Sequence, residues 1–372
     1  MPIDDVLGRS RQVIFPAAGS IEVGTVDVPP PGPGDLVMRV RRVGICATDL
    51  HLLDGHIGDP FPLVPGHEFV GEVAAIGATA AADRHLAVGD RIAVEMQLPC
   101  GTCARCLEGR YNICERDDPA TLAGPGREYG VNIPRTSHPG LWGGYADYLW
   151  VPAEAIVHRM PSELPWDTAA LVEPLAVAFR TIHRGRVGPG DRVVIIGPGP
   201  VGLLTSAAAK IAGASHVTMV GTRDHRLELS TRFGADVAIN SRTTPDLQRA
   251  IAAAIGGLAD VVIEVAGVPA AQSQAVTLVR RGGRVVLAGA CGWTADVTFG
   301  SDRDLLTREI DVLPSFLSAG GYEPSIAALV EGAFPFAELV THRFPLENVR
   351  DAYELVRGKR DDVIKAVLVL SD

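Results

Sequence analysis

A glycine-rich turn between a short apolar run and a helical pattern constrains this fold more than any other segment. The run Arg192–Ile196 leads directly into the turn GPGPVG, residues 197–202. In a GxGxxG turn the glycines permit a tight bend, close approach of the backbone to a pyrophosphate, and close packing of helix on strand. We therefore expect a dinucleotide whose pyrophosphate lies at the amino terminus of the following helix. The cofactor-binding residues expected in this turn are Gly197, Gly199, Pro200, Val201 and Gly202.

The second half of the chain continues this alternation of apolar runs and helical patterns. Further strands are expected at His216–Val220, Asp260–Glu264, Arg284–Ala288 and Asp311–Phe316, and helices at Val201–Ala212, Asp224–Phe233, Pro245–Ile255 and Pro269–Val279. Neighbouring parallel strands need long connections, which helices supply. The alternation therefore predicts a doubly wound parallel sheet of the α/β class.

The first half, up to about Tyr148, has a different texture. Short β-type runs without a sustained helical period are separated by Gly, Pro and Asp, and they include Leu36–Val43, Phe69–Ile76 and Asp90–Val94. The chain has 41 glycines and 27 prolines among its 372 residues, a larger share than the average of about 12% for the two residue types together. With 372 residues, enough for two domains, the pattern predicts an irregular antiparallel barrel beside the parallel sheet. In the tail, a helix at Val349–Val356 and a strand at Ile364–Leu370 are expected to pack on the barrel.

The residues after the second strand of the parallel sheet predict which nicotinamide cofactor binds. An NAD site usually has Asp or Glu here, hydrogen-bonded to the ribose 2′-hydroxyl. This sequence instead has Gly221, Thr222 and Arg223, which offer room, a hydroxyl donor and a charged fork for a 2′-phosphate. We predict NADP in preference to NAD, and we assign Asp224 as the cap of the next helix. The alternative for Arg223 is a solvated surface residue.

Charge and hydropathy exclude two classes of partner. Asp and Glu number 44 against 34 Lys and Arg, so the net charge is −10, which argues against a general nucleic-acid binder. Residues Met1–Ser10 lack the pattern of a secretory signal, and the apolar stretches are broken well before the roughly 18 residues of a membrane span. We expect a cytoplasmic protein with neither nucleic acid nor membrane as partner.

Four of the six cysteines are clustered in one short segment and predict a metal site. They are Cys100, Cys103, Cys106 and Cys114. Such spacing in a cytosolic chain is typical of metal ligation rather than of disulfides. Four thiolates suit a closed, structural tetrahedral zinc, with an iron–sulfur cluster as the rival. No role is assigned to Cys291.

A second set of metal-ligand residues is scattered along the chain. Cys46, His67 and one of the carboxylates Glu68 and Glu173 would make three ligands and leave a fourth position open, as a catalytic zinc requires. Each residue also has an ordinary explanation: a buried thiol, a core histidine or a carboxylate near a helix start. Spacing alone cannot bring these residues together.

The whole chain from about Arg39 onward resembles a known family. The matching motifs are VGICATDLH, PLVPGHEFVGEVAAIG, VGDRI, CGTCARCLEGRYNIC, GGYADYLWVP, EPLAVA, GPGPVG and VIKAVLVL. In this order they resemble the zinc-dependent medium-chain dehydrogenase/reductase superfamily, the alcohol dehydrogenase-like enzymes. The resemblance implies a GroES-like β-barrel catalytic domain with both zinc sites (residues 1–176, completed by 318–372) and a Rossmann NADP-binding domain (177–317). It also implies catalysis between the domains and a homodimer or homotetramer.

The resemblance also implies roles for the scattered residues. Cys46 and His67 match fixed ligands of the catalytic zinc, while Glu68 and Glu173 share or exchange the remaining coordination, in an order that stays open. Glu173 in EPLAVA is similar to the polyol, threonine and glucose dehydrogenase branch. Thr48 and His51 match a proton relay from the alcohol to the surface, and Asp49 matches a residue that orients the zinc-bound histidine.

The reaction implied is hydride transfer between a secondary alcohol, or the ketone in reverse, and NADP. The alternatives are a zinc-containing NADPH-dependent enone reductase, a polyol or sugar dehydrogenase, and a non-catalytic zinc protein that acts by binding. Candidate pocket residues are Ile57, Leu141, Trp142, Trp293 and Phe316, each of which could equally belong to the core. Their apolar character favours a bulky or cyclic alcohol over a free sugar.

Overall fold

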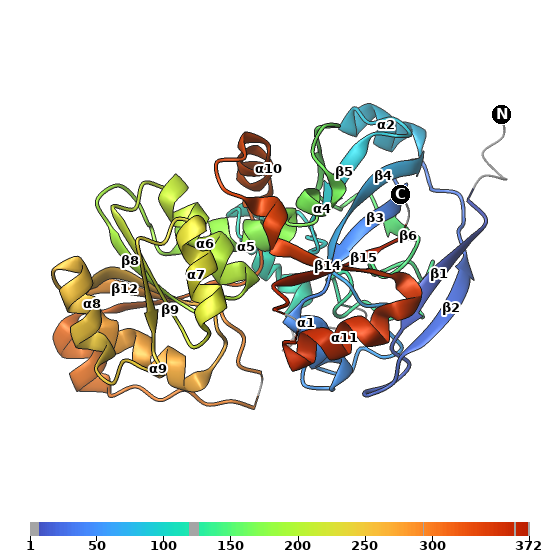
Figure 1. The fold of residues 1–372 in the computed structure, drawn as a ribbon. Coiled ribbons are helices and arrows are strands. Elements are labelled where there is room, and N and C mark those ends of the chain that lie inside the picture. The colour runs from blue at the N-terminus through green and yellow to red at the C-terminus, as the bar shows by residue number, and fades with distance from the viewer. Residues whose placement is uncertain (1–6, 119–125, 293, 361, 371–372) are drawn as a thin grey trace. The chain divides into compact units, whose positions relative to one another are not determined.

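The computed structural model describes residues 7–118, 126–292, 294–360 and 362–370. The chain divides into two compact units (Figure 1). The first comprises Met1–Glu173, Ile326–Glu331 and Phe336–Asp372, and the second comprises Pro174–Ser325 and Gly332–Pro335. The first crossing between the units falls inside helix α5 (Val172–Arg184). The domain limits at 176/177 and 317/318 stay a prediction.

The first unit contains a seven-stranded sheet in the order β14-β15-β3-β4-β5-β7, with β6 paired to β3. These strands are β3 (Leu36–Gly44), β4 (Glu68–Ile76), β5 (Arg91–Val94), β6 (Tyr148–Val151), β7 (Val157–Arg159), β14 (Val340–Pro345) and β15 (Lys365–Val369). A separate two-stranded sheet is formed by β1 (Arg9–Ile14) and β2 (Glu22–Asp27). The predicted return of the tail is confirmed, because β15 pairs antiparallel with β3.

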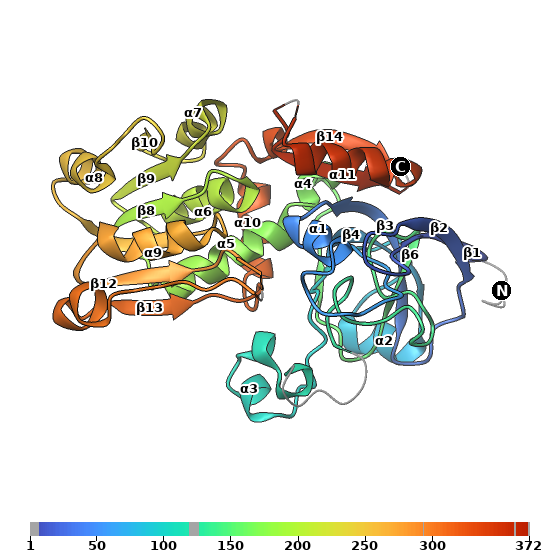
Figure 2. The ribbon, with the colours of Figure 1, turned by 90° about the horizontal axis from the view of Figure 1, so that it is seen from below.

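Short helices interrupt the first half of this unit, where the sequence shows no sustained helical period. They are α1 (Ala47–Leu53), α2 (Ala78–Arg84), α3 (Ala104–Leu107) and α4 (Trp166–Ala169). The helix expected at Val349–Val356 is present as α11 (Val349–Gly358), and α10 (Tyr322–Glu331) is divided between the units. The seven residues of α1 amount to only two turns, too few for an apolar periodicity to be visible. The α3 segment belongs to a lobe set apart from the barrel strands of its own unit (Figure 2).

The second unit is a six-stranded, all-parallel sheet in the order β10-β9-β8-β11-β12-β13. Its strands are β8 (Arg192–Ile196), β9 (His216–Gly221), β10 (Val237–Asn240), β11 (Ala259–Glu264), β12 (Val279–Leu287) and β13 (Asp311–Pro314). Its further helices are α6 (Pro200–Ile211), α7 (Asp224–Arg232), α8 (Leu247–Ile255) and α9 (Pro269–Leu278). This order is that of the dinucleotide-binding fold, which confirms the predicted doubly wound sheet.

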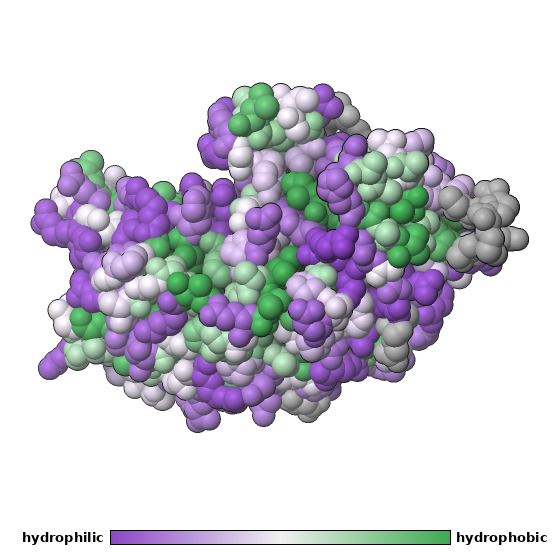
Figure 3. All heavy atoms as spheres, turned by 90° about the horizontal axis from the view of Figure 1, so that it is seen from above, coloured by the Kyte–Doolittle hydropathy of each residue, from purple (hydrophilic) through white to green (hydrophobic). Residues whose placement is uncertain are grey.

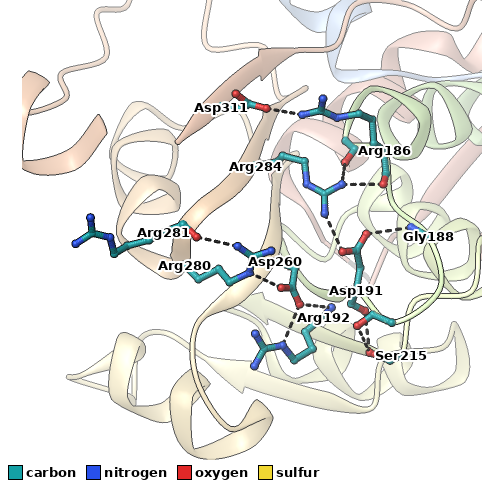
Figure 4. Close-up of polar contacts among 12 residues, drawn as sticks. Arg186, Gly188, Asp191, Arg192, Ser215, Asp260, Arg280, Arg281, Arg284 and Asp311 are labelled. Carbon is teal, nitrogen blue, oxygen red and sulfur yellow. Dashed lines mark hydrogen bonds and ion pairs between the residues drawn. The ribbon is translucent and has the colours of Figure 1, made fainter. Parts of the chain in front are cut away.

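Charged side chains join the starting ends of these parallel strands (Figure 4). The Asp260 carboxylate accepts hydrogen bonds from Arg192 Nε (2.9 Å) and Arg280 Nε (2.5 Å), and Arg284 forms an ion pair with Asp191 (2.8 Å). Burial raises the pKa of Asp260, but the hydrogen bonds from the two arginines outweigh it and hold that pKa well below its usual range. The network therefore connects the strands at their amino-terminal ends. The glycine-rich turn lies at the opposite end of the strands, because it follows the carboxyl end of β8.

Hydrophilic residues cover much of the face seen in Figure 3. Within the described ranges, no helix is both long and apolar enough to cross a membrane.

Candidate active site

Helix α1 positions three residues that the sequence assigns to catalysis. It begins directly after its N-cap, Cys46, and carries Thr48, Asp49 and His51. Thr48 and His51 lie three positions apart and therefore on the same side of the helix. The buried Asp49 carboxylate accepts hydrogen bonds from the Cys46 backbone N–H (2.8 Å) and from the Tyr145 hydroxyl (2.8 Å). These bonds hold the first turn of the helix in place.

A thiol, an imidazole and a carboxylate converge beside this helix. Ligand atoms of Cys46, His67 and Glu68 all lie within 4.8 Å of one another. The strands bring them together, because Gly44 at the end of β3 pairs with Glu68 at the start of β4. A Cβ at residue 44 would lie 1.9 Å from Glu68 Oε2, so the glycine leaves the space that this carboxylate occupies. Three of the four predicted catalytic-zinc ligands thus form one compact group.

The orientation of His67 shows that this group suits a metal. His67 Nδ1 lies 3.5 Å from Asp49 Oδ1. The side chains of His67 and Glu68 are both buried, with 5% and 2% of their surface exposed. Since Nδ1 faces Asp49, Nε2 is the nitrogen available to a metal, and the carboxylate would orient the ligating ring. A thiolate, an imidazole and a carboxylate fit a zinc that keeps a fourth position open.

Electrostatics couple the predicted ligands. Burial lowers the pKa of His67, but the charge of Asp49 and hydrogen bonds with Asp49 and Cys46 outweigh it and hold that pKa well above its usual range. Glu173, the fourth predicted ligand, is buried in α5. Burial, and then the charge of Glu68, raise the pKa of Glu173 to about 8.

A buried lysine that sequence analysis did not identify completes the cluster. Lys365 on β15 forms an ion pair with Glu68 and donates a hydrogen bond to the Ile45 carbonyl (3.1 Å). The side chains of Lys365 and Glu68 are only 4% and 2% exposed, so each charge depends on the other for compensation. The signal in the sequence is the single lysine inside the apolar run VIKAVLVL.

The four clustered cysteines converge as well. Sulfur atoms of Cys100, Cys103, Cys106 and Cys114 lie within 4.8 Å of one another, and the Cys100–Cys106 pair is 3.9 Å apart. Backbone N–H groups of Cys103 and Cys106 point at the sulfurs of Cys100 (3.3 Å) and Cys103 (3.5 Å). Such donors favour thiolates: although burial raises the pKa of Cys100, N–H groups of Thr102 and Cys103 lower it to about 5. The geometry fits a closed four-thiolate zinc.

The glycine-rich turn has the geometry that its pattern predicts. Gly197 has a φ of +114°, and a Cβ there would lie 2.8 Å from the backbone nitrogen of Ala266. A Cβ on Gly202 would lie 1.8 Å from the Gly197 carbonyl oxygen, so helix and strand pack closely. A Cβ on Gly199 would meet no described atom within 4 Å, which leaves this N-cap of α6 open to a pyrophosphate. Pro200 begins the helix, followed by Val201.

Glu264 supports this turn and was not identified from the sequence. Its carboxylate is fully buried at the end of β11 and accepts hydrogen bonds from the backbone N–H of Ala266 (2.8 Å) and Gly267 (3.0 Å). Ala266 is the residue that restricts Gly197 to glycine. Glu264 therefore shapes the backbone beside the turn.

The residues at the end of β9 and directly after it only partly match their predicted roles. A Cβ on Gly221 would lie 2.4 Å from Pro198 Cγ, so packing against the turn already requires glycine there. Thr222 is exposed, and the half-buried Arg223 guanidinium has no partner among the described residues. The cap assigned to Asp224 is wrong: Arg223 is the N-cap of α7, and Asp224 begins the helix and accepts a hydrogen bond from Asn240 Nδ2 (2.7 Å).

The candidate pocket residues fall into different environments. Leu141 is fully buried in a core cluster with Trp150, and Trp142 packs against that cluster. Leu141 is therefore a core residue, the alternative already considered for it. Phe316 is 52% exposed and Ile57 is half-buried, whereas Trp293 lies outside the described residues.

Comparison with known proteins identifies the class. Residues 32–162 match the alcohol dehydrogenase GroES-like domain family, and residues 200–331 match the zinc-binding dehydrogenase family. A probable alcohol dehydrogenase of Mycobacterium tuberculosis is 38% identical over 95% of this chain and 96% of its own length. An erythritol/L-threitol dehydrogenase of Mycolicibacterium smegmatis is 34% identical over 91% of each chain.

Solved structures agree in fold. A zinc-binding dehydrogenase of Sinorhizobium meliloti bound to NADP has a TM-score of 0.85 and 30% identity, covering 98% of this chain and 100% of its own. An alcohol dehydrogenase of Escherichia coli complexed with NADH has the same TM-score with 28% identity and the same coverage. Fold and donor groups thus define a zinc-binding oxidoreductase of the alcohol dehydrogenase type. The chain belongs to the zinc-dependent medium-chain dehydrogenase/reductase superfamily.

Proposed function

We propose that the protein transfers a hydride between a secondary alcohol and NADP, with the ketone as substrate in the reverse direction. The observation that carries this proposal is the donor group of Cys46, His67 and Glu68 within 4.8 Å, with Thr48 Oγ1 only 3.6 Å from Cys46 Sγ. A hydroxyl thus lies beside the side chains that would hold a metal. Three donor side chains leave a fourth metal position open for a substrate oxygen, which suits alcohol–ketone chemistry. A structural metal site would instead be closed by a fourth protein ligand.

The residues around this group have distinct roles in the proposal. Cys46, His67 and a carboxylate from Glu68 or Glu173 would hold zinc. Bound zinc supplies Lewis-acid polarisation, which lowers the pKa of an alcohol or polarises a carbonyl. Lys365, paired with Glu68, keeps that carboxylate compensated when it is not a ligand.

Two side chains on α1 would move the proton that alcohol oxidation releases. Thr48 Oγ1 would accept it from the substrate hydroxyl while passing its own proton on toward His51. Asp49 takes no proton in this scheme; its buried carboxylate holds the His67 ring and the start of the helix in position.

NADP is proposed as the cofactor because of the charge near the end of β9. No acidic residue occupies positions 221–223, and the Arg223 guanidinium has no partner in the described part of the chain. A 2′-phosphate could therefore bind Arg223, with Thr222 as a hydroxyl donor. The similar structures hold NADP in one case and NADH in the other, so a direct measurement must decide.

The proposed substrate is a bulky or cyclic secondary alcohol. A polyol is the second candidate, favoured by Glu173 and by the similarity to the erythritol/L-threitol dehydrogenase. A cytoplasmic homodimer or homotetramer stays a prediction.

The test is reduced-nicotinamide absorbance with a panel of secondary alcohols, polyols, ketones and enones, using NADP and NAD in parallel. We expect alcohol oxidation with a higher kcat/KM for NADP. Arg223→Gln should raise KM for NADP about 10- to 100-fold, the loss of one hydrogen bond to a charged group, and leave KM for NAD unchanged. Arg249→Gln, on the exposed side of α8, is the matched control. Reduction of enones alone, or equal effects of the two substitutions, would contradict the proposal.

A further inference from the structure

The carboxyl end of α1 brings two histidines together. After Leu53 the C-cap is Asp54, and Gly55 has a φ of +71°. The Gly55 N–H donates to the Leu52 carbonyl (2.9 Å), and the His56 N–H donates to the His51 carbonyl (2.8 Å). These two bonds define a Schellman motif. In this motif two side chains meet: that of the second residue after the C-cap, and that of the third-last residue of the helix. In this chain those positions are His56 and His51.

The two imidazoles are close enough to exchange a proton. His51 Nδ1 lies 3.5 Å from His56 Nδ1, with ring centroids 5.8 Å apart. His51 is half-buried whereas His56 is exposed, so the pair leads from the helix toward solvent. The contact needs the Nδ1 atom of one ring as donor and that of the other as acceptor, which is the arrangement for a transfer.

A carboxylate and a guanidinium hold this end of the helix. Asp54 accepts two hydrogen bonds from Arg357 on α11, each 2.8 Å. These bonds, more than the nearby imidazoles of His56 and His51, lower the pKa of Asp54. The Asp54–Arg357 pair therefore fixes the residue that lies between the helix and His56.

We propose that His56 is the group that delivers the proton from His51 to solvent during alcohol oxidation. This inference rests on the proposed function. The His51 imidazolium gives the proton on Nδ1 to the Nδ1 lone pair of neutral His56 and becomes neutral. The His56 imidazolium then loses the proton on Nε2 to water or to a buffer base. No electrons move, and the proton count equals the one proton released per alcohol oxidised.

Buffer dependence separates this role from a structural one. In dilute buffer, His56→Gln should lower kcat for alcohol oxidation about 10-fold. This is less than the usual effect of removing a proton-transfer group, because water can still accept the proton from His51 slowly. High concentrations of imidazole should restore the wild-type rate. Gly55→Ala should behave in the same way, because an alanine at φ +71° disrupts the motif but leaves both imidazoles in the chain. His183→Gln, an exposed histidine on α5, is the control and should match the wild type.

A second readout needs neither substrate nor cofactor. In nitrogen NMR of the imidazole rings, His56→Gln should shift the His51 Nδ1 resonance, and His183→Gln should leave it in place. Wild-type protein without alcohol turnover would overturn the proposed function and this inference together. Wild-type turnover with a His56→Gln variant that shows neither a rate loss in dilute buffer nor imidazole rescue would overturn the inference alone.

Discussion

Replacing Lys365 by methionine tests how the buried charges of the candidate site are compensated. Lys365 and Glu68 are 4% and 2% exposed and form an ion pair, so the substitution leaves one buried carboxylate without its partner. Loss of one partner of a buried pair costs about 3–5 kcal/mol. We expect the metal-free protein to lose free energy of unfolding in this range. Zinc bound by Glu68 and its neighbours would supply the missing positive charge, so the zinc-loaded variant should lose much less.

The assay is urea unfolding of metal-free and zinc-loaded protein, followed by tryptophan fluorescence. Trp142, Trp150 and Trp166 all lie in the first unit, which contains the pair. Lys210→Met is the matched control, because Lys210 forms an ion pair with Asp236 (2.6 Å) and is partly exposed. Exposed pairs contribute about 0–1 kcal/mol, so this variant should change little. An equal loss of stability for Lys365→Met with and without zinc would refute the reasoning.

Three further predictions follow from the described contacts. Thr48→Ala should lower kcat for alcohol oxidation about 10²- to 10⁴-fold, which is the usual contribution of a positioned proton-transfer group. Cofactor affinity, measured by fluorescence titration, should stay the same. Unchanged oxidation would exclude Thr48 from the relay. Cys106→Ser should remove the zinc of the four-cysteine lobe and keep the other, which metal analysis by mass spectrometry can check; loss of both metals would mean that the sites are not independent. Because folding lowers the pKa of Asp260, this carboxylate stabilises the fold above its unfolded pKa of about 3.8 and stops doing so as pH falls below that value. In acid unfolding, Asp260→Asn should therefore lose less stability between neutral and low pH than the wild type. An unchanged pH profile would contradict the argument.

Features with a local geometric signature could be predicted from the sequence. The run Arg192–Ile196 and the turn after it became β8, the turn and α6, because the positions that require glycine lie within six residues of one another. The four clustered cysteines converge for the same reason. Strand β10 (Val237–Asn240) was missed, since it lies at the edge of the sheet and buries only one of its four residues.

Features that depend on pairing between distant segments could not be predicted. Lys365 reaches Glu68 only because β15 pairs with β3, and β3 with β4. Tyr145 reaches Asp49 from 96 positions away. Neither contact can be predicted from the spacing of the residues along the chain. The role of Asp224 was predicted wrongly because capping depends on where α7 begins, and element boundaries shift by a residue without changing the pattern.

Helix α1 connects the predicted metal ligand Cys46 with the proposed proton-transfer residues. Its short length explains why hydrogen bonds from outside the helix stabilise both of its ends. Seven residues cannot hold a helix in water by themselves, because isolated helices shorter than about 12 residues are marginal. The Asp49 carboxylate stabilises the first turn through the Cys46 N–H, and the Schellman motif with Asp54 and Arg357 stabilises the last. The contacts that make the helix possible are thus the same contacts that place a ligand thiol at one end and two histidines at the other. Substitutions that loosen the first turn should therefore affect zinc affinity, and those that loosen the last turn should affect proton release, even when they replace neither a ligand nor a histidine.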